Sequence, residues 1–279
     1  MINMKKIYLI ITLVFITLNG ASPQPVFAQN GMVVSTSSQA SEAGIQIMKK
    51  GGNAVDAAVV TGFALAVTSS SNGNIGGGGF MVARLADGTT FTLDYREIAP
   101  AAAHRDMYLD DNGDVIENMS LRTRAASGVP GTVDGLLKVW ADHGSGNISR
   151  RELLAPAIAL AEKGFELSHY EASRFNSYKE LFSRNEAAAE VFIRHDKRPW
   201  KDGDKFVQKD LAKTLKRIAR EGRDGFYTGK TADLIVAEMS RGIGLITYGD
   251  LLNYRSKYRE PVMGSFNDFD LLSMGLPSS

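Results

Sequence analysis

The sequence predicts a mixed fold in which helices and antiparallel strands occupy separate stretches of the chain, an α/β protein of the α+β type. A β-hairpin is expected over residues 80–95, because Asp87-Gly88 lies between two β-prone runs and suits a two-residue turn with positive φ. Capping-box patterns predict that the middle third is helical. Apolar and polar residues then alternate over 261–273, which predicts two closing strands.

The first 28 residues have the pattern of a secretory signal peptide. Lys5 and Lys6 precede an apolar run, and Val26-Phe27-Ala28 has the small-residue pattern that signal peptidase recognises. The apolar run, residues 7–18, is shorter than the ~20 residues that span a bilayer. We therefore expect export to the periplasm or the medium, with no stable membrane span, and one compact domain over residues 29–279.

Composition excludes several classes of function. The chain has 32 Lys and Arg against 31 Asp and Glu, so it lacks the basic field that attracts nucleic acid, and no nucleic-acid partner is expected. It has no cysteine, which excludes disulfides and a thiol nucleophile. No metal site and no cofactor are predicted, because the four histidines show no spacing typical of metal ligands: His104, His143, His169 and His195.

A short strand and two helices are predicted before the hairpin. The strand covers residues 31–35, and the first helix begins near Ser38 or Ser41 and ends before Gly51-Gly52. Asn53 caps the second helix, residues 54–67, which is small or apolar on every side. Such a helix is buried all round, and its small residues predict close packing against a sheet.

After the hairpin, the sequence predicts an irregular segment over 97–127 and then mostly helices. Thr132 is expected to cap a helix over 133–142, and Pro156 to break or restart the helix that opens at Ser149. The remaining predicted elements are helices from Ser168, over 209–221 and over 228–241, a surface turn over 197–204, and a short turn that opens at Thr247.

A glycine-rich loop leads into the hairpin, and an arginine ends it. Gly76 to Gly79 carry no side chains, so a backbone or a ligand can approach them closely. Phosphate binding is disfavoured, because these glycines precede a strand and no Gly-Lys-Ser/Thr follows. Alternation along the strand places Arg96 on its polar face. The residues alone favour a structural ion pair of Arg96 with Asp94 or Glu97.

The chain after residue 28 contains six characteristic stretches, which are Gly51–Ala58, Asn74–Met81, Asp94–Pro100, Gly128–Val133, Pro156–Ala161 and Tyr254–Val262. Together, and in this order, they resemble the γ-glutamyltranspeptidase family. The resemblance implies the N-terminal part of the large subunit, within a four-layer αββα sandwich of the N-terminal-nucleophile hydrolases that this chain does not complete. It also implies an exported γ-glutamyltransferase or glutathione hydrolase made as a self-cleaving precursor.

The resemblance also implies the chemistry. A γ-glutamyl-enzyme forms on the N-terminal threonine of a small subunit, which comes from the same precursor and is the expected protein partner. Arg96 binds the α-carboxylate of the γ-glutamyl substrate, for which a planar guanidinium is suited. The threonine belongs to the missing small subunit, so we expect no catalytic residue in this chain and no activity from it alone. Ser278 and Ser279 are not the serines of the small-subunit pocket.

Two alternatives remain open. A related acylase that acts on glutaryl or cephalosporin side chains uses the same scaffold, and a substrate panel separates it from the transpeptidase. A secreted binding protein can also keep the scaffold without catalysis. A reading frame that continues past Ser279 to a threonine opening a second subunit favours the enzyme, whereas a stop codon there favours the binding protein.

Overall fold

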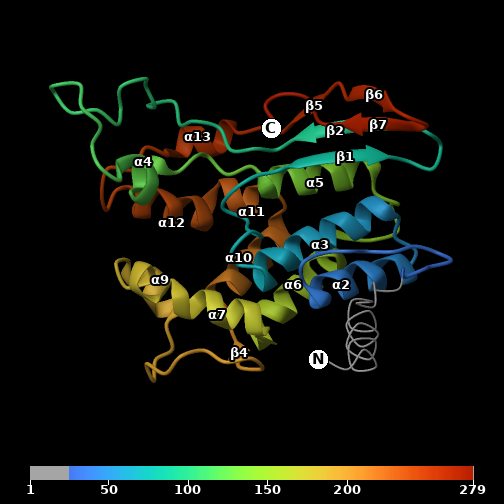
Figure 1. The fold of residues 1–279 in the computed structure, drawn as a ribbon, viewed down its shortest axis with the longest axis horizontal. Coiled ribbons are helices and arrows are strands. Elements are labelled where there is room, and N and C mark those ends of the chain that lie inside the picture. Colours follow the sequence, from blue (N-terminus) through green and yellow to red (C-terminus); the bar gives the residue numbers. More distant parts are fainter. Residues whose placement is uncertain (1–24, 279) are drawn as a thin grey trace, which may run out of the picture. The chain divides into compact units, whose positions relative to one another are not determined.

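A three-stranded antiparallel sheet holds the glycine loop and Arg96 in place (Figure 1). Strands β1 (Phe80–Arg84), β2 (Thr90–Asp94) and β5 (Lys257–Arg259) are hydrogen-bonded in that order in the computed structural model. Leu93 of β2 faces Met81 on one side and Tyr258 on the other. The hairpin prediction is confirmed, but β5 comes from a distant part of the chain and was not predicted.

The structure describes residues 25–278, and the chain divides into two units after Met32. Residues 1–24, most of the predicted signal peptide, lie outside the described part, and residues 25–32 contain no helix or strand. A search of the described residues finds no helix with the length and apolar character needed to cross a membrane. The predicted strand over 31–35 is wrong, because these residues pair with no other described segment and a strand requires such a neighbour.

The hairpin turn is longer than predicted. The Gly88 amide donates to the Leu85 carbonyl at 3.0 Å, and the Leu85 amide donates to the Thr89 carbonyl at 2.8 Å, so residues 86–88 form the loop. Among these residues only Gly88 has a positive φ, at +89°. A turn followed by a left-handed glycine closes a three-residue hairpin loop, so a two-residue turn is not required.

The first two helices begin and end close to their predicted limits. Helix α2 (Ser38–Lys49) starts after the N-cap Ser37 and ends before Gly51, whose φ is +92°. Helix α3 (Ala54–Thr68) starts with a capping box formed by Asn53 and Asp56. The local signals in the sequence therefore place both helices correctly.

Helix α3 is buried almost all round, but its main neighbours are helices. It packs against α2, α5 (Thr132–His143) and α6 (Arg150–Lys163), so the predicted packing against a sheet is wrong (Figure 1). Gly62 on α3 lies against the Leu136 side chain, where an added Cβ would be 3.1 Å from the nearest atom. The small residues of α3 thus allow close approach between helices.

Two details of α5 and α6 correct the predictions. Gly131, not Thr132, is the N-cap of α5, since the helix already includes Thr132. A Cβ at Gly131 would lie 2.0 Å from the Tyr95 carbonyl oxygen, so this position requires glycine. Helix α6 continues through Pro156 without a break. A proline removes one backbone donor from a helix, and the burial of Leu153, Leu154 and Ala157 on this helix offsets that loss.

The rest of the chain is mostly helical, as predicted. The capping boxes at Ser149, Ser168 and Thr247 are all present, and the last opens a helix where a turn was expected. The remaining elements are β3 (Phe165–Glu166), β4 (Lys205–Phe206), α4 (Met119–Arg122), η1 (Arg124–Ala126), α7 (His169–Ser177), α8 (Lys179–Phe182), α9 (Glu186–Phe192), α10 (Lys209–Glu221), α11 (Asp224–Tyr227), α12 (Gly229–Met239) and α13 (Tyr248–Asn253).

The two closing strands are confirmed, but they do not extend the main sheet. Strands β6 (Val262–Phe266) and β7 (Phe269–Ser273) form their own antiparallel pair. Their side chains are largely exposed, including the apolar Met263, Phe266 and Phe269.

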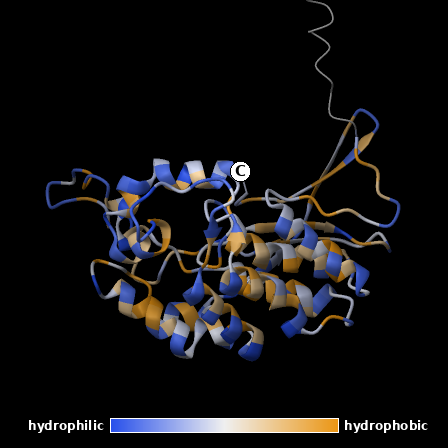
Figure 2. Cartoon of the chain, turned by 90° about the horizontal axis from the view of Figure 1, so that it is seen from below, coloured by the Kyte–Doolittle hydropathy of each residue, from blue (hydrophilic) through white to orange (hydrophobic). Residues whose placement is uncertain are grey.

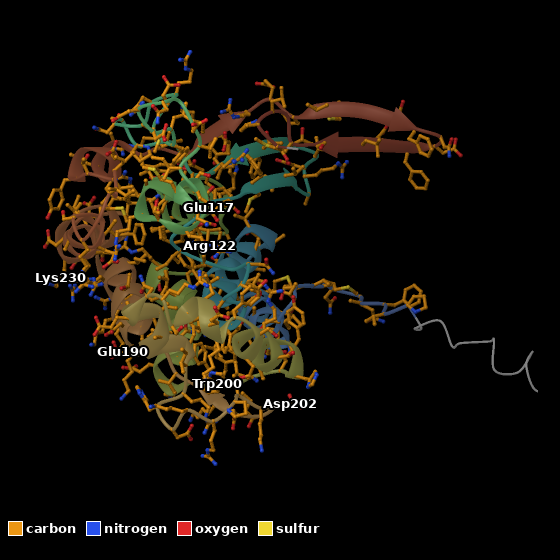
Figure 3. All side chains as sticks on the ribbon, turned by 60° about the vertical axis from the view of Figure 1, so that its left-hand side comes forward. Glu117, Arg122, Glu190, Trp200, Asp202 and Lys230 are labelled. Atoms are coloured by element: carbon orange, nitrogen blue, oxygen red, sulfur yellow. The ribbon has the colours of Figure 1, made fainter. Side chains whose placement is uncertain are left out.

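The buried side chains of the helices and the main sheet form one continuous hydrophobic core. Figure 2 shows that the helices carry both hydrophobic and hydrophilic residues. Figure 3 shows charged side chains such as Glu190, Asp202 and Lys230 at the surface, where all three are exposed. This pattern is the one expected of helices that bury one face and solvate the other.

Candidate functional site

Arg96 lies in an open pocket immediately after strand β2. The pocket has a volume of about 360 Å³ and is lined by Arg96, by Gly78 and Gly79 of the glycine loop, and by Pro277 and Ser278, among others. The Arg96 side chain is exposed, and its Nη1 donates to the Pro277 carbonyl oxygen at 2.9 Å. Because a guanidinium has five N–H donors, this single bond leaves others directed at the pocket and solvent.

The ion pair that the residues alone favoured for Arg96 is not formed. Asp94 pairs with Arg259 instead, with 2.8 Å between Oδ2 and Nε. The other Asp94 oxygen accepts the backbone amide of Arg96 at 3.0 Å. Within residues 25–278, neither Asp94 nor Glu97 forms a salt bridge with the Arg96 guanidinium. Asp94 therefore holds the Arg96 backbone without neutralising its charge.

The glycine loop packs tightly against the end of β2. The Gly79 carbonyl accepts the Tyr95 amide at 3.0 Å, and a Cβ at Gly78 would lie 2.4 Å from the Tyr95 carbonyl oxygen and 2.7 Å from the Arg96 Cα. The Gly77 carbonyl accepts amides from the start of α5, at 2.7 and 3.0 Å, which satisfies donors that a helix N-terminus leaves free. A Cβ at Gly76 would meet nothing within 4 Å. Three of the four glycines are therefore packing residues.

Substituting Gly78 with alanine is expected to destabilise the protein by about 1–3 kcal/mol, because the new methyl group would collide with rigid backbone atoms of residues 95–97. Gly76→Ala is the matched control in the same loop, and we expect its free energy of unfolding to change by no more than about 0.5 kcal/mol. Urea denaturation measures both. Equal stability of the two variants would contradict the packing role of Gly78.

The side chain of Tyr254 holds the Arg96 backbone in place. Its hydroxyl donates to the Arg96 carbonyl at 2.8 Å, and its side chain is 1% exposed. Burial raises the pKa of the Tyr254 hydroxyl, so the group stays protonated and remains a donor. The ring stacks on Tyr227, with 5.8 Å between ring centroids, and the Tyr227 hydroxyl donates to the Pro130 carbonyl at 2.8 Å. Two buried tyrosines thus connect β2 to the start of α5.

A buried ion pair lies next to these tyrosines. Asp134 in the first turn of α5 accepts Nε of Arg223 at 2.7 Å, and its other oxygen accepts the amide and hydroxyl of Ser256 at 2.8 and 2.7 Å. Arg223 also donates to the Tyr254 carbonyl at 2.7 Å and lies over the Tyr227 ring at 4.4 Å from its centroid. This network fixes the segment that leads from α13 into β5.

Tyr254, Asp134 and Arg223 were not predicted from the sequence, although Tyr254 lies in one of the stretches that carry the resemblance. The one available signal was Asp134, an acidic residue in an otherwise apolar run of α5. The histidines have other surroundings, and His143 stacks on Phe91 with 4.2 Å between centroids. Over the described part of the chain, no group of His, Asp and Glu side chains is arranged to hold a metal ion.

Comparisons with known proteins find relatives over most of the chain. The family model described as gamma-glutamyltranspeptidase matches residues 40–279. A glutathione hydrolase proenzyme from Pseudomonas sp. (strain A14) is 44% identical over 262 residues, which cover 94% of this chain and 45% of that protein. The crystal structure of Helicobacter pylori gamma-glutamyltranspeptidase superposes with a TM-score of 0.88 at 41% identity, over 91% of this chain and 72% of that one.

An acylase is also among the similar proteins. The Acylase ACY 1 proenzyme of Pseudomonas sp. (strain SE83) is 36% identical over 262 residues, covering 92% of this chain and 46% of that protein. The chain spans less than half the length of these curated relatives. The chain has a mixed helix and sheet fold, as the Helicobacter pylori structure does, and the four-layer sandwich stays a prediction.

Proposed function

Because the chain belongs to the γ-glutamyltranspeptidase family, we propose that it supplies the glutamate-binding part of a γ-glutamyltransferase or glutathione hydrolase. The observation that carries the proposal is the pocket of about 360 Å³ in which the Arg96 guanidinium is exposed and forms no salt bridge within the described residues. The relatives named glutathione hydrolase act on a γ-glutamyl substrate, whose carboxylate is the kind of group that a guanidinium recognises.

Arg96 binds the α-carboxylate of the glutamyl group. A guanidinium and a carboxylate form two parallel hydrogen bonds, which fix orientation as well as charge. The backbone of Arg96 is held by Asp94 at the amide and by Tyr254 at the carbonyl, so the side chain extends from a fixed point. A site held in this way places the γ-carbonyl at a constant distance from the residue that attacks it.

The nucleophile comes from a partner subunit of the same precursor. Its N-terminal threonine attacks the γ-carbonyl through Oγ, while its own α-amine accepts the hydroxyl proton. The carbon–nitrogen bond to the leaving group breaks as that nitrogen takes the proton, and a γ-glutamyl ester remains on the enzyme. Water or the amine of an amino acid or peptide then cleaves the ester. The relatives' designation as proenzymes supports processing into subunits.

A substrate panel tests this function against the acylase alternative, which the relative named Acylase ACY 1 supports. Protein expressed from its complete reading frame is expected to cleave a γ-glutamyl anilide at least about tenfold faster, in kcat/KM, than a glutaryl anilide. The glutaryl group keeps the carboxylate but lacks the α-amine, so a site that also binds the amine loses those contacts. Preference for glutaryl or cephalosporin side chains would support the acylase. Absence of turnover with every substrate would support a non-catalytic binding protein.

A further inference from the structure

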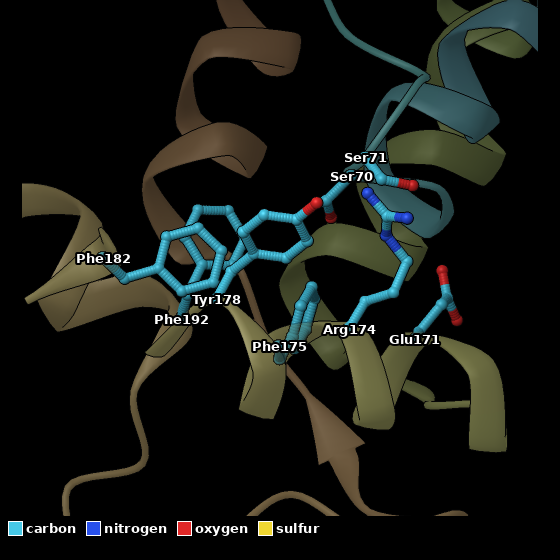
Figure 4. Close-up of a pocket in the computed structure, with 8 residues that line it drawn as sticks. All are labelled: Ser70, Ser71, Glu171, Arg174, Phe175, Tyr178, Phe182 and Phe192. Carbon is cyan, nitrogen blue, oxygen red and sulfur yellow. The ribbon is translucent and has the colours of Figure 1, made fainter. Parts of the chain in front are cut away.

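A second pocket lies between α7–α9 and the loop that follows α3 (Figure 4). Its volume is about 230 Å³, smaller than the range of about 300–1,000 Å³ that is typical of drug-sized ligands. It shares no lining residue with the Arg96 pocket. We call it the aromatic pocket, because Phe175, Phe182 and Phe192 form one wall.

The apolar wall consists of packed aromatic rings and suits a hydrocarbon group. Phe182 and Phe192 are stacked with 4.8 Å between ring centroids, and Phe175 meets Phe192 edge-on at 5.3 Å. Phe175 is buried in the hydrophobic core, which anchors the group. A flat or branched apolar side chain of a ligand can bury its surface here.

The opposite wall carries hydrogen-bond donors that the described residues leave unused. Arg174 Nε and Ser70 Oγ are both buried, and neither has a hydrogen-bond partner within residues 25–278. Figure 4 shows the Arg174 guanidinium extending toward Ser70 and Ser71, with the Tyr178 hydroxyl close to Ser70. A buried donor without a partner costs about 1–3 kcal/mol, and an anionic ligand group would remove this cost.

An acidic side chain stands beside the guanidinium. Glu171 lies about one turn before Arg174 on α7 and lines the same pocket, and no salt bridge joins the two within the described chain. Its Oε2 accepts the amide and hydroxyl of Ser168 in the capping box, at 3.4 and 3.3 Å, which leaves Oε1 for a ligand. Burial raises the pKa of the Glu171 carboxyl, and a nearby ammonium group would lower that pKa again. The pocket therefore presents one site for a carboxylate, one for an ammonium and one for an apolar side chain.

We propose that the aromatic pocket binds a small apolar or aromatic α-amino acid. The carboxylate pairs with Arg174 and the hydroxyls of Ser70 and Ser71, the ammonium pairs with Glu171, and the side chain packs on the phenylalanine rings. Ser70 and Ser71 begin the loop that ends in the glycines of the Arg96 pocket. The pocket is a site additional to the glutamate site proposed above, and it does not depend on that function.

Isothermal titration calorimetry of the full chain with L-phenylalanine tests this assignment. Saturable binding is expected, and it should weaken at least tenfold for 3-phenylpropionate, which lacks the ammonium, for phenethylamine, which lacks the carboxylate, and for glycine, which lacks the ring. Arg174→Gln and Glu171→Gln should each weaken L-phenylalanine binding at least tenfold. Arg184→Gln is the matched control. Arg184 is an exposed arginine between α8 and α9 that does not line the pocket, so this variant should bind L-phenylalanine as the wild type does.

Arg96→Ala separates this site from the proposed glutamate site and should leave L-phenylalanine binding unchanged. Loss of binding in Arg96→Ala with retention in Arg174→Gln would overturn the assignment, as would absence of saturable binding to the wild type. Circular dichroism establishes that each variant is folded, and if Arg174→Gln is not, wild-type affinity in folded Glu171→Gln would equally overturn the proposal.

Discussion

Arg96→Ala is expected to lower kcat/KM for a γ-glutamyl anilide by about two orders of magnitude, which corresponds to ~3 kcal/mol of lost transition-state stabilisation. The guanidinium is exposed in its pocket and forms no salt bridge within residues 25–278, so its main electrostatic partner in this account is the substrate carboxylate. Truncating one partner of a charge-assisted pair removes both hydrogen bonds and charge compensation. Steady-state kinetics of the protein expressed from its complete reading frame measures the effect.

Two further variants show whether the loss of activity in Arg96→Ala comes from losing the planar guanidinium at this position. Arg96→Lys should recover only part of the activity, because lysine keeps the charge and loses the planar fork. Arg84→Ala is the matched control, since Arg84 is an exposed arginine at the far end of β1 in the same hairpin. Its kinetics should stay within about twofold of the wild type. Wild-type kinetics in both Arg96 variants would return this residue to a structural role.

Asp134→Ala is expected to lower the free energy of unfolding by about 3–5 kcal/mol, because it leaves the largely buried Arg223 without its carboxylate. The Asp134 side chain is 6% exposed, and the Arg223 side chain is 22% exposed. The substitution also removes the acceptor for the amide and hydroxyl of Ser256. Urea denaturation followed by circular dichroism is the measurement.

Asp210→Ala is the matched control for this substitution. Asp210 also lies in the first turn of a helix and also pairs with a cation, Lys213, but its side chain is 92% exposed. The two substitutions remove similar interactions with a helix dipole. The difference between their changes in the free energy of unfolding therefore gives the contribution of the buried network. We expect Asp210→Ala to cost no more than about 1 kcal/mol. A similar cost for both would show that the Asp134 network contributes little to stability.

The helices with local signals could be predicted from the sequence to within a few residues. Ser149 with Glu152 and Ser168 with Glu171 form the predicted capping boxes, and the predicted cap Asn53 forms a further one with Asp56. These interactions involve residues three positions apart, so a short stretch contains all the information. The hairpin was predictable for the same reason.

Features that depend on distant residues could not be predicted. Strand β5 pairs with β2 across more than 160 residues, and nothing local indicates which strand Lys257–Arg259 will join. The neighbours of α3 were predicted wrongly, since small residues permit close packing against either a sheet or a helix. Pro156 would break α6 only if packing did not hold the turns on either side of it. In this structure the buried residues of α6 hold those turns, and the helix continues.

The candidate site was predictable in position but not in its surroundings. Alternation along β2 placed Arg96 at the strand end, where the structure finds it. The partner of Asp94 proved to be Arg259, which lies beside it only because β5 joins the sheet. The support from Tyr254 likewise comes from a residue 158 positions away. Such contacts decide whether an arginine is neutralised or remains available to a ligand.

Binding of the α-carboxylate by Arg96 can be measured by changing the protein and the substrate together. A 4-aminobutyryl anilide lacks only the α-carboxylate of the γ-glutamyl anilide. The wild-type protein should prefer the γ-glutamyl anilide by about two orders of magnitude in kcat/KM, whereas Arg96→Ala should show less than about threefold preference, because interacting groups give non-additive effects. An undiminished preference in Arg96→Ala would show that Arg96 does not bind the α-carboxylate.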